Sequence, residues 1–137
     1  MRSWRTLGVA AALLAARAAL AHHSPSAYDL ATEISIEGTI VKLGWENPHI
    51  YFVVETVAAD GGKTLHEVEA GPLAAARSLG LDRAAISPGA RVTVRANPNR
   101  AGPDKIARGV AVMTADGNVY ALAERGRARD GAAPSAR

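Results

Sequence analysis

Apolar and polar residues alternate from Glu33 onward, and this alternation restricts the fold more than any other feature of the chain. Three isoleucines share one face of the extended segment: Ile34, Ile36 and Ile40. A period of two residues is typical of a half-buried β-strand. At Val41 the apolar positions change to the other face, and Gly38 and Gly44 bracket the change, as in a strand with a bulge or a sharp bend. We therefore expect one long, strongly curved first strand.

The residues after this strand predict further strands and one short helix. Strand-like segments follow at residues 50–57, 64–70, 90–96, 106–113 and 119–122. Residues 73–79 have helix-forming composition, with Pro72 in the first turn and Gly80 after the last residue. Three strands, a helix and two strands, of which the first can bend across both halves, are typical of an OB-type barrel.

We accordingly predict an all-β fold with one short helix, a small five-stranded OB-like barrel over residues 33–123. Closure into a barrel protects the sheet edges of a domain that has a single phenylalanine, Phe52. A small open β-sandwich is the alternative fold.

The first 21 residues have the pattern of a cleavable signal peptide. Two arginines precede an apolar run at 7–16, and residues 19–21 have the Ala-x-Ala pattern that signal peptidase requires. The run is too short to cross a bilayer of roughly 30 Å, and Arg17 interrupts its end. We expect a Sec-type leader (1–21), no stable membrane span after cleavage, and a periplasmic or secreted protein that begins at His22.

Charge and cysteine content limit the partners and cofactors. The leader carries three of the 16 basic residues and none of the 13 acidic ones, so the mature chain is formally neutral. A nucleic-acid-binding surface needs a basic stripe, and nucleic acid is therefore excluded as a predicted partner. Residues 124–137 predict a disordered basic tail. The chain has no cysteine, which excludes disulfides and thiolate metal ligands.

Two adjacent histidines, His22 and His23, follow the predicted cleavage site. A free terminal amine and the His22 imidazole can chelate one metal ion, and a further imidazole completes the three-nitrogen arrangement called a histidine brace. This nitrogen-rich set suits Cu(II). In a second arrangement, the amine binds together with the intervening amide and the His23 imidazole. The alternative to both is a disordered His-His terminus that binds copper only adventitiously.

His49 is the candidate for the further imidazole. It follows Trp45, Asn47 and Pro48 in the loop after the first strand, where a proline turn would orient an exposed imidazole. Its alternative role is that of a turn residue which hydrogen-bonds a nearby carbonyl. Trp45 is expected either to shield the site from water or to pack in the core.

Chain length limits how His22 and His49 can meet. The first strand separates them, so the N-terminal segment 22–32 must fold back along the barrel, or two molecules must share the site. Tyr28 is expected to anchor this return through packing and a hydrogen-bonded hydroxyl, and Asp29 by capping a turn.

The fourth histidine, His66, is predicted to lie away from His49. A hairpin turn at residues 61–62 would pair His66 with Thr56 or Val57, roughly seven residues and about 23 Å from His49 at about 3.3 Å per residue. Two glutamates on the same strand are assigned to a solvated face: Glu67 and Glu69.

Three motifs together resemble a family of small exported bacterial proteins, the domain-of-unknown-function family 6152. They are HHSPSAYD at 22–29, GTIVKLGWENPH at 38–49 and PGARVTV at 88–94. The resemblance implies an exported OB-like barrel and brings no established activity. Similar sequences are expected to have tryptophan at the position of His66, which favours a non-ligand role for it. The residues that the resemblance singles out are His22, His23, Tyr28, Asp29, Trp45, Asn47, Pro48 and His49.

Two functions compete, and an enzyme is a less favoured third. The first is a periplasmic copper-binding protein that uses His22 with His49 or His23. The second is a metal-independent binding module for a small ligand or a protein. The chain lacks a G-x-S-x-G elbow, a phosphate-binding loop and an H-E-x-x-H motif. A copper oxidase or oxygenase is the enzyme alternative.

Overall fold

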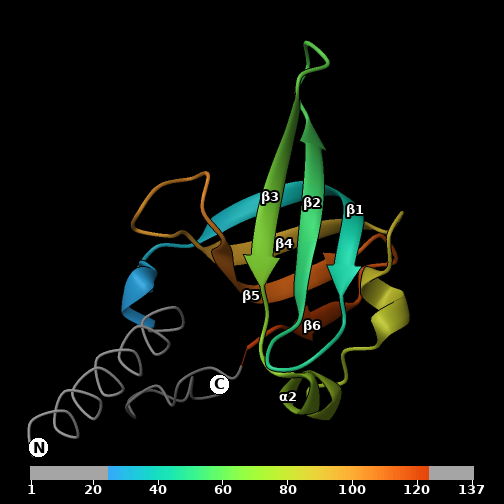
Figure 1. The fold of residues 1–137 in the computed structure, drawn as a ribbon. Helices are drawn as coiled ribbons and strands as arrows, with labels where there is room; N and C mark the ends of the chain where they lie inside the picture. Colours follow the sequence, from blue (N-terminus) through green and yellow to red (C-terminus); the bar gives the residue numbers. More distant parts are fainter. Residues whose placement is uncertain (1–24, 124–137) are drawn as a thin grey trace, which may run out of the picture.

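The computed structural model describes residues 25–123, whose strands wind into the barrel of Figure 1. In chain order the elements are the 3-10 helix η2 (Pro25–Ala27), strands β1 (Ile34–Gly44), β2 (Tyr51–Val57) and β3 (Lys63–Glu69), helix α2 (Leu73–Ser78), the 3-10 helix η3 (Arg83–Ile86), and strands β4 (Arg91–Asn97), β5 (Ala107–Thr114) and β6 (Val119–Ala121). No helix within this range is long and apolar enough to cross a membrane. The predicted leader, His22, His23 and the predicted tail lie outside the described residues.

Strand β1 is the long, curved strand that the alternating pattern predicts. Its first half, from Ile34 to Thr39, pairs antiparallel with β4, and its second half, from Thr39 to Gly44, pairs antiparallel with β2. The register with β2 shifts between Ile40 and Lys42, which is where the apolar positions change face. A bulge bends a strand and increases its twist. At this point β1 therefore passes from one half of the barrel to the other.

Strand β3 closes the barrel by pairing with β5. The sheet order is β3-β2-β1-β4-β5-β6, and a parallel pairing of Val68 with Ala107 and of Glu69 with Arg108 joins β3 to β5. Five strands thus form a closed barrel, and β6 extends the sheet beyond β5. This topology confirms the predicted five-stranded OB-like barrel, with α2 between β3 and β4, and excludes the open sandwich.

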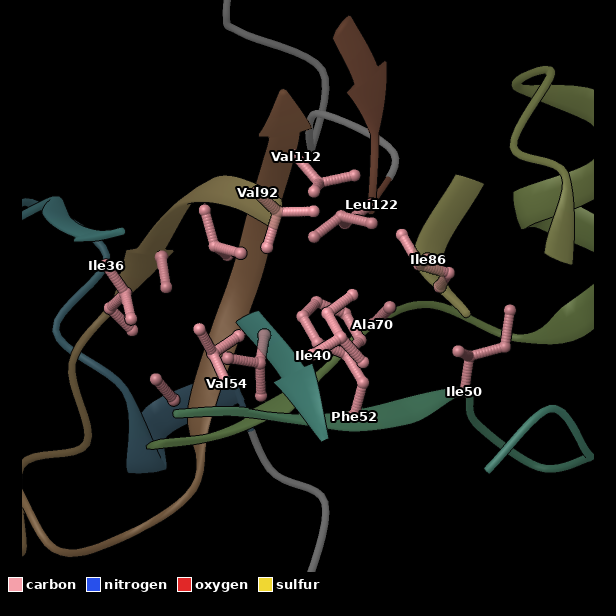
Figure 2. Packing of buried hydrophobic residues seen from close by; sticks show 14 of the residues in the cluster. Ile36, Ile40, Ile50, Phe52, Val54, Ala70, Ile86, Val92, Val112 and Leu122 are labelled. Carbon is pink, nitrogen blue, oxygen red and sulfur yellow. The ribbon is translucent and has the colours of Figure 1, made fainter. Parts of the chain in front are cut away.

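Branched aliphatic residues and the single phenylalanine fill the interior, as Figure 2 shows. Phe52, Ile40 and Leu122 are fully buried. Helix α2 adds Ala76 to the same cluster, and η3 adds Ile86. In Figure 1, α2 lies at the end of the barrel where the loop from β1 to β2 passes. This loop carries His49, so the core supports the end of the barrel at which the candidate site lies.

The register of the β2–β3 hairpin differs from the prediction. His66 pairs with Val54, and not with Thr56 or Val57. The turn is centred on Asp60: the Ala58 amide donates to the Gly62 carbonyl at 2.8 Å, and the Gly62 amide donates to the Asp60 carboxylate at 2.9 Å. Because this turn is centred earlier than a two-residue turn at 61–62 would be, β3 is shifted along β2 by two or three residues.

Candidate functional site

A pocket of about 310 Å³ lies where β3 closes on β5. Its walls come from five parts of the chain that are distant in sequence, among them the stretch from Glu69 to Ala75 and Ala123 after β6. The N-terminal segment contributes Pro25 and Tyr28, the β1–β2 loop contributes His49, the end of β3 contributes Glu69, and β5 contributes Arg108. The pocket therefore brings the N-terminal segment and the histidine loop together within one molecule.

The Glu69 carboxylate is the centre of this arrangement. One of its oxygens lies 2.5 Å from Nδ1 of His49, and the other accepts a hydrogen bond of 3.0 Å from the Tyr28 hydroxyl. The side chains of His49 and Glu69 are 32 % and 20 % exposed, so the pair is accessible from the pocket without being fully solvated. Glu69 thereby links a loop residue and a residue of the N-terminal segment to the barrel.

The N-terminal segment folds back along the barrel and is fastened to the residues that follow β4. Tyr28 forms a β-bridge with Asn99, the Asp29 amide donates to the Pro98 carbonyl at 2.9 Å, and the Arg100 amide donates to the Ala27 carbonyl at 2.9 Å. These backbone contacts show that the described part of the segment makes the return that the length argument requires, without a second molecule.

Side chains fix the same return. Asp29 caps its turn by accepting hydrogen bonds from the Ala31 amide and from the Thr32 hydroxyl, the latter at 2.7 Å. The hydrogen bond from Thr32 is the main reason why the pKa of Asp29 lies below its ordinary value, with a smaller contribution from Arg100. The buried Asn97 side chain donates to the Thr32 carbonyl at 2.9 Å. The expected roles of Tyr28 and Asp29 as anchors of this segment agree with these contacts.

The Tyr28 hydroxyl is held in its neutral form. Burial, followed by the negative charge of Glu69 and their hydrogen bond, raises the pKa of Tyr28 from its ordinary 10.0 to about 12, while Arg108 opposes the shift. The phenol therefore remains a hydrogen-bond donor to Glu69 at neutral pH. The position of the hydroxyl and its raised pKa both make Tyr28 the donor and Glu69 the acceptor.

This shift predicts how stability depends on alkaline pH. A pKa that folding raises contributes stability that is complete below pH 10.0 and is lost as the pH rises toward about 12. Because Tyr28 is only partly buried, we expect the contribution to be about 1 kcal/mol. Urea unfolding at several pH values should show a steeper alkaline loss of stability in the wild type than in Tyr28→Phe. Tyr120→Phe, outside the pocket, is the matched control, and parallel slopes for the wild type and Tyr28→Phe would contradict the assignment.

The other residues predicted for the site do not line this pocket. Trp45 is partly buried against the core and borders a separate hollow with Arg77 and Leu81, which agrees with its alternative role as a core residue. Asn47 and Pro48 are exposed in the loop and precede His49 through a cis peptide bond between them. Their position relative to His49 is set by the loop and not by contacts in the pocket.

His66 takes no part in the pocket. Its Nε2 lies 3.1 Å from the Thr56 hydroxyl on the neighbouring strand. Within residues 25–123, no three histidine, aspartate or glutamate side chains are grouped so that they could hold a metal ion.

The two charged side chains of the pocket other than His49 are not predicted as site residues from the sequence. Glu69 is assigned to a solvated face, and this assignment is wrong because the true register pairs Glu69 with Tyr51, two residues after His49. Arg108 enters the pocket through its parallel pairing with Glu69, and it donates to the Asn97 side chain at 3.1 Å. A correct prediction of the hairpin register would have placed Glu69 beside His49.

Comparison with known proteins identifies the family. A family model described as a family of unknown function (DUF6152) matches residues 11–108, which is more than half of the chain. The chain belongs to this family. The DUF6152 match confirms the family predicted from the sequence, and it extends from before the described residues to Arg108 in the pocket. Neither the search of curated proteins nor the search of solved structures found a match.

Proposed function

We propose that this DUF6152 protein is exported and binds Cu(II) through His49 and the N-terminal residue His22 of the processed chain. The observation that carries the proposal is that Pro25 and His49 line the same pocket. His22 precedes Pro25 by three residues, and an extended chain spans at most about 3.6 Å per residue. The Cα atom of a terminal His22 is therefore at most about 11 Å from that of Pro25.

The donor set that would form there consists of nitrogen atoms. The amine and imidazole of His22, with the imidazole of His49, would supply three nitrogens, a set that suits Cu(II) by geometry and by the general order of metal affinities. The arrangement of the amine, the intervening amide and the His23 imidazole remains the second form of the proposal. Both forms require that the leader is removed after Ala21.

Replacing His49 tests the first form directly. We expect His49→Gln to weaken Cu(II) binding by more than about tenfold, because a ligand is lost and not only an outer-shell partner. His66→Gln is the matched control, since His66 lies on β3 outside the pocket. The measurement is a competition titration against a chromophoric chelator, with protein whose mass shows that it begins at His22.

The outcomes separate the two proposed functions. Equal Cu(II) affinities for His49→Gln and His66→Gln would exclude His49 as a ligand. If the processed wild type also binds no Cu(II), the result favours a metal-independent binding module. The pocket, with Glu69 and Arg108 in its wall, is then the place where a small polar ligand would bind.

A further inference from the structure

We infer that Glu69 is the positioning residue of this copper site: its carboxylate orients the His49 ring and fastens the segment that leads to His22. The inference rests on the proposed function, because it assigns a role in the same site. It concerns a residue at the end of β3 that contacts both parts of the chain from which the ligands would come.

The first step concerns the protons of the His49 ring. A carboxylate only accepts hydrogen bonds, and we therefore assign the proton of the neutral ring to Nδ1, the ring nitrogen that lies 2.5 Å from Glu69. In a neutral imidazole with a proton on Nδ1, the lone pair is on Nε2. Outer-shell carboxylates of this kind fix the tautomer and the ring orientation of metal-binding histidines. Glu69 thus prepares Nε2 of His49 as the metal-donating atom.

The second step concerns the N-terminal segment. The oxygen of Glu69 that contacts His49 is Oε1, whereas Oε2 accepts the hydrogen bond from the Tyr28 hydroxyl. Tyr28 stands three residues after Pro25, and both residues line the pocket. One carboxylate oxygen therefore contacts the loop that carries His49, while the other accepts a hydrogen bond from the N-terminal segment.

The third step concerns the support of Glu69 itself. Its backbone pairs with Tyr51 in β2 and with Arg108 in β5, so it lies at the seam that closes the barrel. Arg108 is held in turn by a hydrogen bond to the buried Asn97 side chain. A site supported by paired strands keeps its geometry better than one supported by a free loop. Glu69 is therefore a fixed reference to which the histidine loop and the N-terminal segment are attached.

Glu69→Leu tests the inference, because leucine is of similar size and accepts no hydrogen bonds. In the metal-free protein, ¹⁵N NMR of the His49 ring should show that the fixed Nδ1-protonated form is lost. Cu(II) affinity should fall by roughly 10- to 100-fold, the range typical of losing an outer-shell partner. Glu67→Leu is the matched control, since Glu67 is an exposed glutamate on the same strand, outside the pocket. It should keep the wild-type tautomer and affinity.

Two further variants complete the design. Tyr28→Phe removes only the second contact: it should accelerate hydrogen exchange of the Asp29 amide and leave the His49 tautomer unchanged. If Glu69→Leu does not fold, Glu69→Gln replaces it, because an amide has one acceptor oxygen for the two donors and should lose at least one of the contacts.

The readouts distinguish this inference from the proposed function. Retention of the Nδ1-protonated form of His49 in a folded Glu69→Leu protein would overturn the positioning role. A wild type that binds no Cu(II) would refute the proposed function. In that case the tautomer, measured without metal, would still decide whether Glu69 orients His49.

Discussion

A Gly-Pro extension before His22 should weaken Cu(II) binding by more than about 100-fold, beyond the effect typical of losing an outer-shell partner. The extension moves the terminal amine two residues away, or about 7 Å along an extended chain. Proline has no backbone N–H, so its nitrogen cannot bind the metal as a substitute for the terminal amine. The two proteins, one that begins at His22 and one that begins at the added glycine, are released in vitro from the same fusion and titrated with Cu(II) in competition with a chelator.

The metal-free unfolding temperatures of the two proteins are the control, and they should agree because the extension leaves the barrel unchanged. His23→Gln in the protein that begins at His22 separates the two ligand sets: it abolishes the amine, amide and His23 chelate and spares the set that uses His49. Equal Cu(II) affinities with and without the extension would show that the terminal amine is not a ligand.

The barrel could be predicted because its determinants are local in the sequence. The alternation of isoleucines with polar residues defines β1, and the change of face at Val41 coincides with the register shift that the structure shows between Ile40 and Lys42. The order of the strands and the position of the helix then favour the OB-like topology, in which closure of the barrel removes the free sheet edges. Each of these inferences uses residues that are close in the sequence.

The site was only partly predictable because its centre depends on register and on closure. Two adjacent glycines predict a turn at 61–62, but only the first of them, Gly61, has a positive φ, of 84°, and the side chain of Asp60 fixes the turn earlier. The resulting shift is what places Glu69 near His49. Arg108 arrives through a parallel pairing between strands that are distant in the sequence, and no local pattern of residues predicts that register.

Tyr28 and Asp29 were accessible to sequence reasoning for a different reason. If His22 and His49 share a site, the length of β1 requires that the N-terminal segment folds back or that two molecules contribute, and the tyrosine and the aspartate of that segment can anchor a turn. The structure shows that the Tyr28 hydroxyl donates a hydrogen bond to Glu69 and that Asp29 accepts one from the Thr32 hydroxyl. The acceptor for Tyr28 was not predictable, since it depends on the hairpin register.

Replacing Gly38 with alanine should destabilise the barrel by about 3 kcal/mol or more, the upper range for overpacking. A Cβ atom at position 38 would lie against the backbone carbonyl oxygen of Glu55, closer than van der Waals contact allows. Gly38 stands where β1 passes from β4 to β2, so only a movement of the backbone, in β1 or in β2, relieves the clash. Urea unfolding gives the free energy, and an unchanged m-value shows that the mutation changes stability and not the surface exposed on unfolding.

Gly44→Ala is the matched control, because it places the same methyl group in the same strand. Its Cβ would meet the ring of Tyr51, the far end of a side chain that is 37 % exposed and can rotate away. The expected cost is about 1 kcal/mol, as for a side chain moved from its preferred rotamer. Equal losses at the two positions would mean that glycine is needed for the bending of β1 in general. A much larger loss at Gly38 would mean that the close approach of β1 to β2 sets the curvature, and with it the direction in which β2 presents the His49 loop.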